Sequence, residues 1–447
     1  MQHEDRSDTY REGSITLGGA VAMGTGVMIG AGIFALTGQV AEYSGPWFPI
    51  AFLVAALVSG FSAYTYVKVT NRYPSAGGIA MILQKAYGRS TVTGAAALLM
   101  AFSMVINESL VARTFATYAL RLFNFEGTDW LVPVLAVGLI FAAFLVNVAG
   151  NTLVEVISKI AALLKIGGIA LFAVAVLVAA GFSFQPAEAS SSALETGPLG
   201  FLAGVALAIL AFKGFTTITN SGGEIENPHR NVGRAIIISL GICLVIYLLV
   251  AFAVGSSLSI PEIVAARDYS LAEAARPAFG NLGVTFTVVI AVIATASGVI
   301  ASIFAVSRMT TMLTDMRLIP HRHFGLPGNV QRHMLVYTVV FAGLLAALFD
   351  LGRIASLGAI FYLVMDVIIH WGVMRKLHAE ISARTAVLIA AIVFDLVALG
   401  AFVAIKWQSD PLIILIGASG IALIFLLEFA FLKLGATRGT AAVGHDD

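Results

Sequence analysis

The chain has 447 residues, of which 59% are hydrophobic and only 11% are charged. Soluble domains are about 45–50% apolar and about 25% charged, so this composition excludes a water-soluble globular protein and indicates an integral membrane protein. The formal net charge is +1 and no basic run occurs, which excludes a nucleic-acid partner. The single cysteine, Cys243, excludes an intramolecular disulfide and a cysteine metal cluster.

The apolar residues fall into segments long enough to cross a bilayer, because about 20 helical residues span a hydrocarbon layer of about 30 Å. We therefore predict an all-α integral membrane protein with twelve transmembrane helices and no soluble domain. In chain order they lie at residues 15–43, 47–71, 93–122, 130–149, 152–181, 198–221, 232–257, 281–314, 334–350, 354–375, 384–406 and 411–433. The connection after the seventh helix is long enough for a short surface helix.

Basic residues are unevenly divided between the two sides of these segments. If the N-terminus is inside, seventeen of the 26 Lys and Arg residues fall on the cytoplasmic side and five on the outer side. An excess of Lys and Arg marks cytoplasmic loops. We expect a multi-pass protein of the cell membrane, with cytoplasmic tails at residues 1–14 and 434–447.

The first predicted helix is unusually rich in glycine, in the stretch Met23-Gly-Thr-Gly-Val-Met-Ile-Gly-Ala-Gly-Ile-Phe34. Glycine lets a helix open and expose backbone amides at membrane depth, which is tolerated only where the backbone lines a cavity. Gly26 and Gly30 also match a small-residue packing face between helices. This segment alone does not choose between the two interpretations.

The sixth predicted helix has a related feature, because Ala211-Phe-Lys-Gly-Phe215 places a charge and a glycine midway along an apolar segment. Helices one and six correspond if the chain contains two halves of five helices. Glycine-interrupted segments at matching positions of two halves indicate a binding site at the membrane midplane. Helix ends attract a carboxylate and an ammonium respectively, so a zwitterionic α-amino acid fits such a site.

Two motifs at this spacing carry a resemblance to a known family. The stretch Val27-Met-Ile-Gly-Ala-Gly-Ile-Phe34, together with Ile225-Glu-Asn-Pro-His-Arg-Asn-Val-Gly-Arg-Ala-Ile236, is similar to the amino acid, polyamine and organocation superfamily. Within it the chain most resembles the ApcT-like proton-coupled amino-acid permeases. The resemblance implies a LeuT-like fold, with inverted repeats at 15–181 and 198–375 and two further helices at 384–433.

The resemblance also implies a substrate site. The backbone amides of Ile29, Gly30, Ala31 and Gly32 would bind the substrate carboxylate. Phe212 and Gly214, with Lys213 between them, would line the other half of the site. The sequence departs from the family pattern at Lys213, Gly223 and Glu108, which bears on the substrate and not on the fold.

Ionisable side chains within membrane helices are costly and often functional. We identify six: Glu108, Arg113, Glu155, Lys159, Lys165 and Lys213. Arg113, Glu155 and Lys159 lie nearer helix ends, where long side chains reach water, so they are interpreted as structural. The resemblance implies that Lys165 stands where sodium-driven relatives hold sodium, donating to Gly26 of helix one and Ser297 of helix eight. Lys165 is then the predicted proton-coupling group, and a fixed structural lysine is the alternative.

Glu108 and Lys213 lie near the middle of their predicted helices. One neutralised pair costs less than two isolated charges in a membrane, which favours an intramembrane salt bridge between them. The alternatives are that Lys213 binds a second substrate carboxylate or that Glu108 binds a substrate amine.

These features together predict a secondary transporter that carries small neutral α-amino acids with protons by alternating access. A permease or exchanger for acidic amino acids or amines is the alternative. No clustered nucleophile or helical histidine pair indicates an enzyme, while a glycine-rich helix lining a pore keeps a channel open as an interpretation. The expected partners are an amino acid, protons and lipid, with no cofactor and no metal; the oligomeric state stays undetermined.

Overall fold

The computed structural model describes residues 13–75, 78–122, 130–149, 151–182, 197–316, 318 and 330–441. Within these ranges the chain is almost entirely helical, and the β-pairing is an isolated bridge between Ile15 and Ile225. In chain order the helices are α1 (Leu17–Met28), the π-helix η1 (Ile29–Ile33), α2 (Phe34–Ser44), the short 3₁₀-helix η2 (Gly45–Trp47), α3 (Phe48–Arg72), α4 (Gly78–Tyr87), α5 (Thr91–Leu120), α6 (Leu131–Ala149), α7 (Asn151–Ala179), α8 (Gly197–Phe212), α9 (Phe215–Asn220), the 3₁₀-helix η4 (Gly222–Glu224), α10 (Pro228–Ser257), α11 (Ile260–Ala265), α12 (Ser270–Ala274), α13 (Arg276–Asp315), α14 (Val330–Leu348), α15 (Leu351–Lys376), α16 (Thr385–Ser409) and α17 (Pro411–Ala441).

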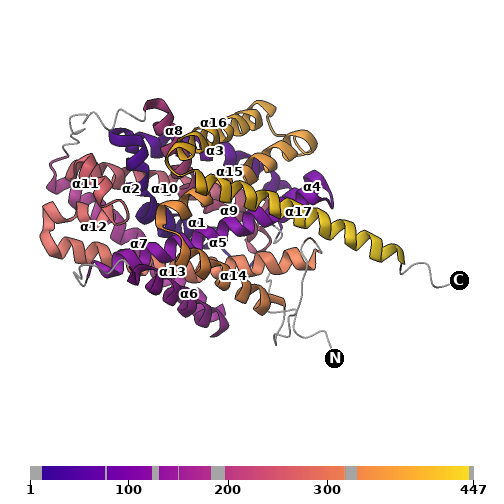
Figure 1. Cartoon of the computed structure of the whole chain (residues 1–447), viewed down its shortest axis with the longest axis horizontal. Helices are drawn as coiled ribbons and strands as arrows, with labels where there is room; N and C mark the ends of the chain where they lie inside the picture. Colours follow the sequence, from indigo (N-terminus) through magenta and orange to yellow (C-terminus); the bar gives the residue numbers. More distant parts are fainter. Residues whose placement is uncertain are drawn as a thin grey trace.

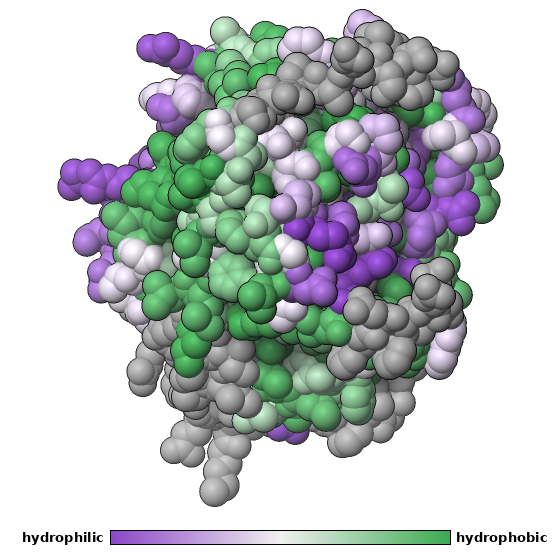
Figure 2. Space-filling view, turned by 90° about the vertical axis from the view of Figure 1, so that its left-hand side faces the viewer, coloured by the Kyte–Doolittle hydropathy of each residue, from purple (hydrophilic) through white to green (hydrophobic). Residues whose placement is uncertain are grey.

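The long helices form a single bundle, with α11 and α12 at its left end in Figure 1. Ten helical stretches in the described residues are long and apolar enough to cross a membrane, and α1 and residues Arg332–Leu348 form shorter apolar helices. Figure 2 views the bundle from the α11 and α12 end: hydrophilic residues gather over the middle, and the surface around them is mostly hydrophobic. This distribution fits a water-facing end surrounded by lipid-facing walls.

Burial separates central helices from peripheral ones. The most apolar windows of α5 and of the α8–α9 stretch are 89% buried, whereas those of α6 and α17 are 17% and 22% buried. Large apolar side chains such as Leu145 and Leu427 point outward, as expected where the neighbour is lipid and not water. A site at the centre of the bundle is therefore built from α5, α8, α9 and the helices packed against them.

The predicted helices agree with the observed ones apart from their ends. The prediction of 93–122, for example, corresponds to α5 at Thr91–Leu120. The predicted start of the eighth helix at residue 281 coincides with a left-handed glycine, Gly280 (φ 54°), inside α13. The short surface helix expected after residue 257 is present as α11 and α12, whereas α4 was not predicted. The total of twelve spans, the inverted repeat and the cytoplasmic tails stay predictions.

Candidate functional site

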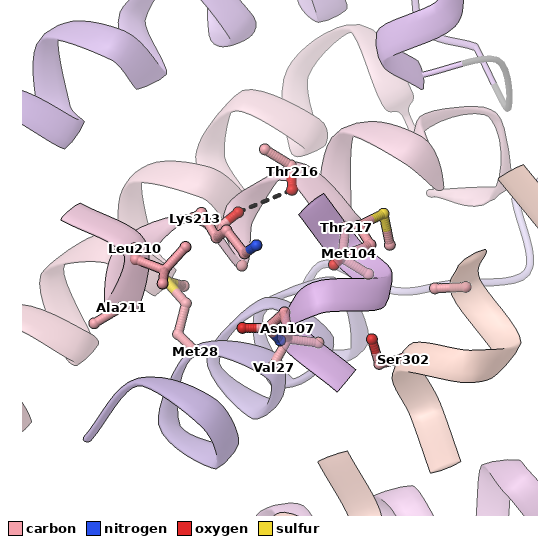
Figure 3. A pocket seen from close by; sticks show the side chains of 12 residues that line it. Val27, Met28, Met104, Asn107, Leu210, Ala211, Lys213, Thr216, Thr217 and Ser302 are labelled. Atoms are coloured by element: carbon pink, nitrogen blue, oxygen red, sulfur yellow. Dashed lines mark hydrogen bonds between the residues drawn. The ribbon is translucent and has the colours of Figure 1, made fainter. Parts of the chain in front are cut away.

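A cavity lies in the middle of the bundle, between α1, α5, the α8–α9 break and α13 (Figure 3). The space that no atom fills is about 420 Å³, counting the part open to solvent. Its wall combines apolar side chains with a few polar ones that point inward. The lining residues are Val27, Met28, Met104, Asn107, Leu210, Ala211, Lys213, Gly214, Thr216, Thr217, Ser302 and Ala305.

The predicted interruption of the sixth span is confirmed. Helix α8 ends at Phe212, Lys213 and Gly214 form a turn, and α9 begins at Phe215. Glycine is required at 214 because a Cβ there would lie 2.6 Å from Met28 Cγ and 2.9 Å from the Met28 amide nitrogen. The break of the sixth span therefore packs directly against α1, and both border the cavity.

The first span has a different form from the predicted open helix. Residues 29–33 make a π-helix between α1 and α2, and the flanking residues Met28 and Phe34 keep right-handed helical dihedrals. A π-turn bonds each residue to the fifth along the chain and widens the helix without opening it, and such bulges are frequent at functional sites. The prediction of an opened backbone is thus wrong for this structure, although the irregularity falls on the predicted residues.

Of the predicted carboxylate-binding residues, Ile29, Gly30 and Gly32 are packed and do not line the cavity. A Cβ at Gly32 would lie 2.5 Å from Tyr247 Oη and 2.7 Å from Ala211 Cβ, and a Cβ at Gly30 would lie 3.1 Å from the Ala294 carbonyl oxygen. Ile29 is fully buried, and the side chain of Ala31 lies outside the described residues. In this conformation the first span borders the cavity through Val27 and Met28 instead.

Tyr247, on α10, links the two irregular segments. Its hydroxyl lies 2.7 Å from the carbonyl oxygen of Met28 and 3.0 Å from that of Ala211, so the one proton can be donated to either. Its ring packs on Phe212 with the centroids 4.9 Å apart, which places Phe212 behind the cavity wall and not on it. Carbonyls near a π-bulge and a helix end lack part of their helical bonding, and a buried hydroxyl supplies the missing donor.

The predicted bridge between Glu108 and Lys213 is wrong for this structure. Lys213 Nζ donates to the carbonyl oxygen of Ser103 at 2.9 Å and contacts its hydroxyl at 3.0 Å. Glu108 accepts a hydrogen bond from Ser302 at 3.2 Å, and its other carboxylate oxygen has no hydrogen-bond partner in the described part of the chain. Ser103 lies one helical turn before Asn107 on α5. It accepts the hydrogen bonds of the Lys213 ammonium, which therefore makes no ion pair with the Glu108 carboxylate. Lys213 lies on the cavity wall (Figure 3).

Lys165 makes the first of its two expected contacts. Its Nζ donates to the Gly26 carbonyl oxygen at 2.6 Å, and the side chain is only 4% exposed. No hydrogen bond joins Lys165 to Ser297 in the described part of the chain, where the Ser297 hydroxyl donates to the Ala294 carbonyl of its own helix at 3.1 Å. Gly26 immediately precedes Val27, which lines the cavity, so Lys165 contacts α1 one residue away from the cavity wall.

The other intramembrane charges differ in how far the structure describes them. Arg113 donates to the Ala346 carbonyl oxygen at 2.7 Å, consistent with a structural interpretation. The side chains of Glu155 and Lys159 lie outside the described residues. Sequence analysis missed Ser103, Asn107 and Ser302, although polar residues in the middle of apolar helices are a usable signal for a cavity.

Comparisons with known proteins agree with this architecture. A family model described as amino acid permease matches residues 15–432. The inner membrane transport protein YbaT of Escherichia coli is 29% identical over 88% of this chain and 90% of its own length. The methylthioribose transporter of Bacillus subtilis is 25% identical over 78% of each chain. The human cationic amino acid transporter 4 is 31% identical over 49% of this chain and 37% of its own.

Proposed function

This chain belongs to the amino acid permease family, whose members are membrane transporters and not enzymes, and we propose that it carries small neutral α-amino acids together with protons. The observation that carries the proposal is the position of Lys165. Its ammonium holds a backbone carbonyl of α1 one residue away from the cavity wall. A change in the charge of this group therefore acts on the helix that borders the substrate.

The cavity supports an amino-acid substrate. Asn107, Thr216, Thr217 and Ser302 supply hydroxyl and amide groups on its wall, which suit a substrate ammonium, while Val27, Met28 and Leu210 supply an apolar surface for a small side chain. Lys213 lies at the same wall, and its charged form opposes a substrate with a cationic side chain. Relatives named for a cationic amino acid and for methylthioribose differ in substrate, so the cargo must be inferred from the cavity.

The carboxylate site at Ile29–Gly32 belongs to a different state of the transporter in this proposal. Amides held in the π-helix are released when this segment unwinds, and freed amides bind a carboxylate. Substrate binding then favours the unwound state, and the loss or gain of the Lys165 contact with Gly26 shifts the balance between the inward-facing and outward-facing states.

Acidic amino acids are the second candidate. Lys213 lines the cavity and makes no ion pair in the described part of the chain. A side-chain carboxylate of the substrate would supply the missing anion. Neutral amino acids are preferred because Ser103 already occupies two hydrogen-bonding directions of the ammonium.

The test begins with the purified full-length protein and the common amino acids. Binding to the folded state raises Tm by mass action, so a thermal-shift screen selects the substrate and separates neutral from acidic candidates. The selected amino acid is then supplied in radiolabelled form to proteoliposomes with an inward proton gradient. We expect accumulation that an uncoupler abolishes. Uptake that ignores the proton gradient would contradict proton coupling, and a shift only with glutamate or aspartate would select the second candidate.

A further inference from the structure

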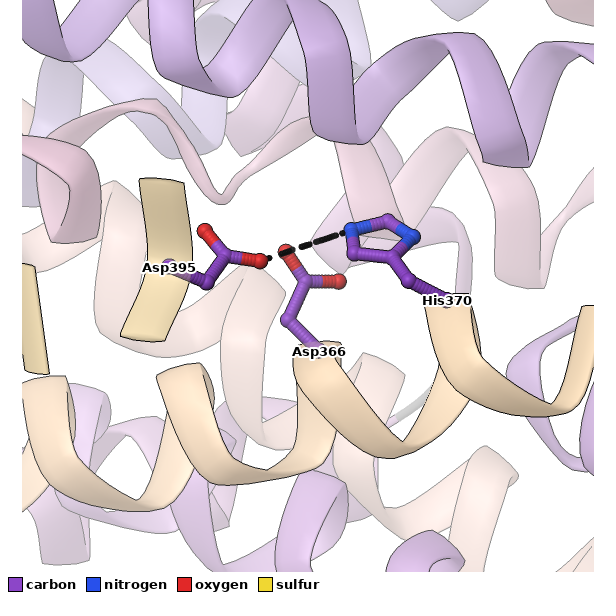
Figure 4. Close-up of side chains that lie close together, drawn as sticks. All are labelled: Asp366, His370 and Asp395. Carbon is purple, nitrogen blue, oxygen red and sulfur yellow. Dashed lines mark ion pairs between the residues drawn. The ribbon is translucent and has the colours of Figure 1, made fainter. Parts of the chain in front are cut away.

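Three titratable side chains meet inside the bundle, away from the cavity. Asp366 and His370 lie four residues apart on one face of α15, and Asp395 approaches them from α16 (Figure 4). The Nε2 atom of His370 is 3.4 Å from Asp366 Oδ2 and 3.5 Å from Asp395 Oδ2. All three residues are 0% exposed. Neither the substrate cavity nor Lys165 involves them.

The polar atoms at the centre of this cluster are largely unsatisfied. Within the described residues, both carboxylate oxygens of Asp395 and both ring nitrogens of His370 have no hydrogen-bond partner. Asp366 differs, because Tyr66 and Ser62 of α3 each donate to it at 2.6 Å. One carboxylate is thus fixed by its neighbours, while the carboxylate and imidazole beside it have no hydrogen-bond partner among the described residues. Leaving such groups unpaired in a protein interior is costly.

The cluster also lacks a compensating basic residue. Among the described residues, the ion pairs of both carboxylates are with His370. The buried cation Lys213 lies 5.9 Å from the ring of Tyr362, one turn before Asp366, and bonds to Ser103 instead. Two carboxylates in a low-dielectric interior need positive charge close by. A divalent cation bound with a neutral imidazole would balance them.

We propose that Asp366, His370 and Asp395 form a site for a divalent transition-metal ion, with zinc the best match. Zinc binds imidazole nitrogen and carboxylate oxygen at about 2.0–2.2 Å, and two ligands of a tetrahedron with that radius are about 3.3–3.6 Å apart. The two measured separations from Nε2 fall in this range. They are longer than the usual 2.7–3.2 Å of an N–H···O hydrogen bond, and the ligand atoms of all three side chains lie within 4.8 Å of one another, so the three groups can converge on one ion.

The surroundings match those of a metal ligand set. Tyr66 and Ser62 orient the Asp366 carboxylate, as hydrogen bonds from neighbouring groups do for ligating carboxylates. A bound ion would connect α15 to α16 directly and to α3 through Asp366. It would therefore act as a structural link between three helices that border the α8 side of the bundle.

Metal content of the purified full-length protein is the first test. Cells are grown with added zinc, the protein is purified in detergent without chelator, and metals are measured by mass spectrometry. We expect about one zinc per chain in the wild type and a large loss in His370→Ala and Asp395→Asn. Glu428→Gln is the matched control, since it removes a buried carboxylate of α17 outside the cluster and should retain the zinc. Zinc retained equally by both cluster variants would overturn the proposal.

A second measurement does not depend on how well the variants fold. Wild-type protein stripped with a chelator is titrated with zinc, and Tm is followed; a rise is expected because the metal binds only the folded state. Cobalt(II) added in place of zinc should give the visible absorption bands of a tetrahedral centre. If the wild type carries no metal and neither ion changes Tm or absorption, the proposal fails and protons neutralise the cluster.

Discussion

The hydroxyl of Tyr247 lies 2.7 Å from the carbonyl oxygen of Met28, at the residue where α1 passes into the π-helix. The same hydroxyl is within reach of Ala211, just before the break of the sixth span. A single hydroxyl of α10 can thus donate its one proton to a backbone carbonyl of either irregular segment beside the cavity.

Tyr247→Phe should therefore destabilise the protein, because one or both buried carbonyls lose their donor. A loss of about 1–3 kcal/mol in the free energy of unfolding is expected from an unsatisfied buried group. Thermal unfolding in detergent measures it. Tyr87→Phe is the comparison: Tyr87 donates to one carbonyl, that of Ile368, away from the cavity, and its loss should be smaller. Equal losses of unfolding free energy in the two variants would show that the second carbonyl near Tyr247 adds nothing to stability.

Gly32→Ala should abolish uptake or folding, since the added Cβ would meet Tyr247 Oη at 2.5 Å and Ala211 at 2.7 Å. Overpacking at a buried contact costs about 1–3 kcal/mol or more. Gly138→Ala in α6 is the control, because nothing lies within 4 Å of the Cβ there and alanine favours a helix. Folded yield and uptake are both measured. Normal yield and uptake in Gly32→Ala would contradict the tight packing of the π-helix.

Lys165→Ala should lose accumulation driven by the proton gradient, while substrate binding in the thermal-shift assay largely survives. The reason is that the variant removes the charge that holds Gly26 but leaves the residues of the cavity wall intact. The measurement is uptake into proteoliposomes at a series of external pH values. Should the variant concentrate substrate with the pH dependence of the wild type, the coupling group lies elsewhere and Glu108 is the next candidate.

The effects of Lys213→Met and Glu108→Gln should be nearly additive, because the two side chains bind Ser103 and Ser302 and form no ion pair with each other, so that only a through-space interaction of their charges remains. Effects of separate interactions add to within about 0.5 kcal/mol, whereas removing one partner of a buried pair is worse than removing both. The two single variants and the double variant are compared by thermal unfolding. A double variant more stable than either single one would restore the salt bridge.

The ion pair between Arg353 and Asp410 makes the connection between α16 and α17 sensitive to acid. Arg353 Nε lies 2.7 Å from Asp410 Oδ2, and this contact lowers the pKa of the Asp410 carboxyl below its ordinary value. A lowered pKa in the folded protein adds stability above the unfolded pKa near 3.8, and that stability is lost as the pH falls through the folded value. Arg353 is 39% exposed, so the effect is within about 1 kcal/mol. Asp410→Asn should lower Tm at pH 7, and its difference from the wild type should shrink as the pH is lowered below 3.8.

Sequence analysis located the features that depend on local composition. The break at Lys213 and Gly214 was predictable because a charge and a glycine interrupt an apolar run. The Lys165 contact with Gly26 followed from the resemblance to a family, not from the residues themselves. The π-helix was not predictable in form, because its flanking dihedrals are those of an ordinary helix and only the bonding partners differ.

Contacts between helices distant in sequence were harder to predict. Nothing in the sequence indicates that Lys213 bonds to Ser103 and not to Glu108. The choice depends on how α5 is rotated about its axis. The cluster at Asp366 was missed although Asp366 and His370 occupy one face of a helix. Asp366 and Asp395 are not among the six predicted intramembrane charges, although both lie within predicted helices.

The bridge between Ile15 and Ile225 constrains how the protein can move. The amide of Ile15 donates to the Glu224 carbonyl at 2.8 Å, and the amide of Glu226 donates to the Ile15 carbonyl at 2.9 Å. The residue just before α1 is thereby joined to the segment that follows α9, while Gly214 contacts Met28 at the other end. Two helices that are nearly 200 residues apart in the chain are thus linked at both ends, so we expect them to move together in a change of conformation.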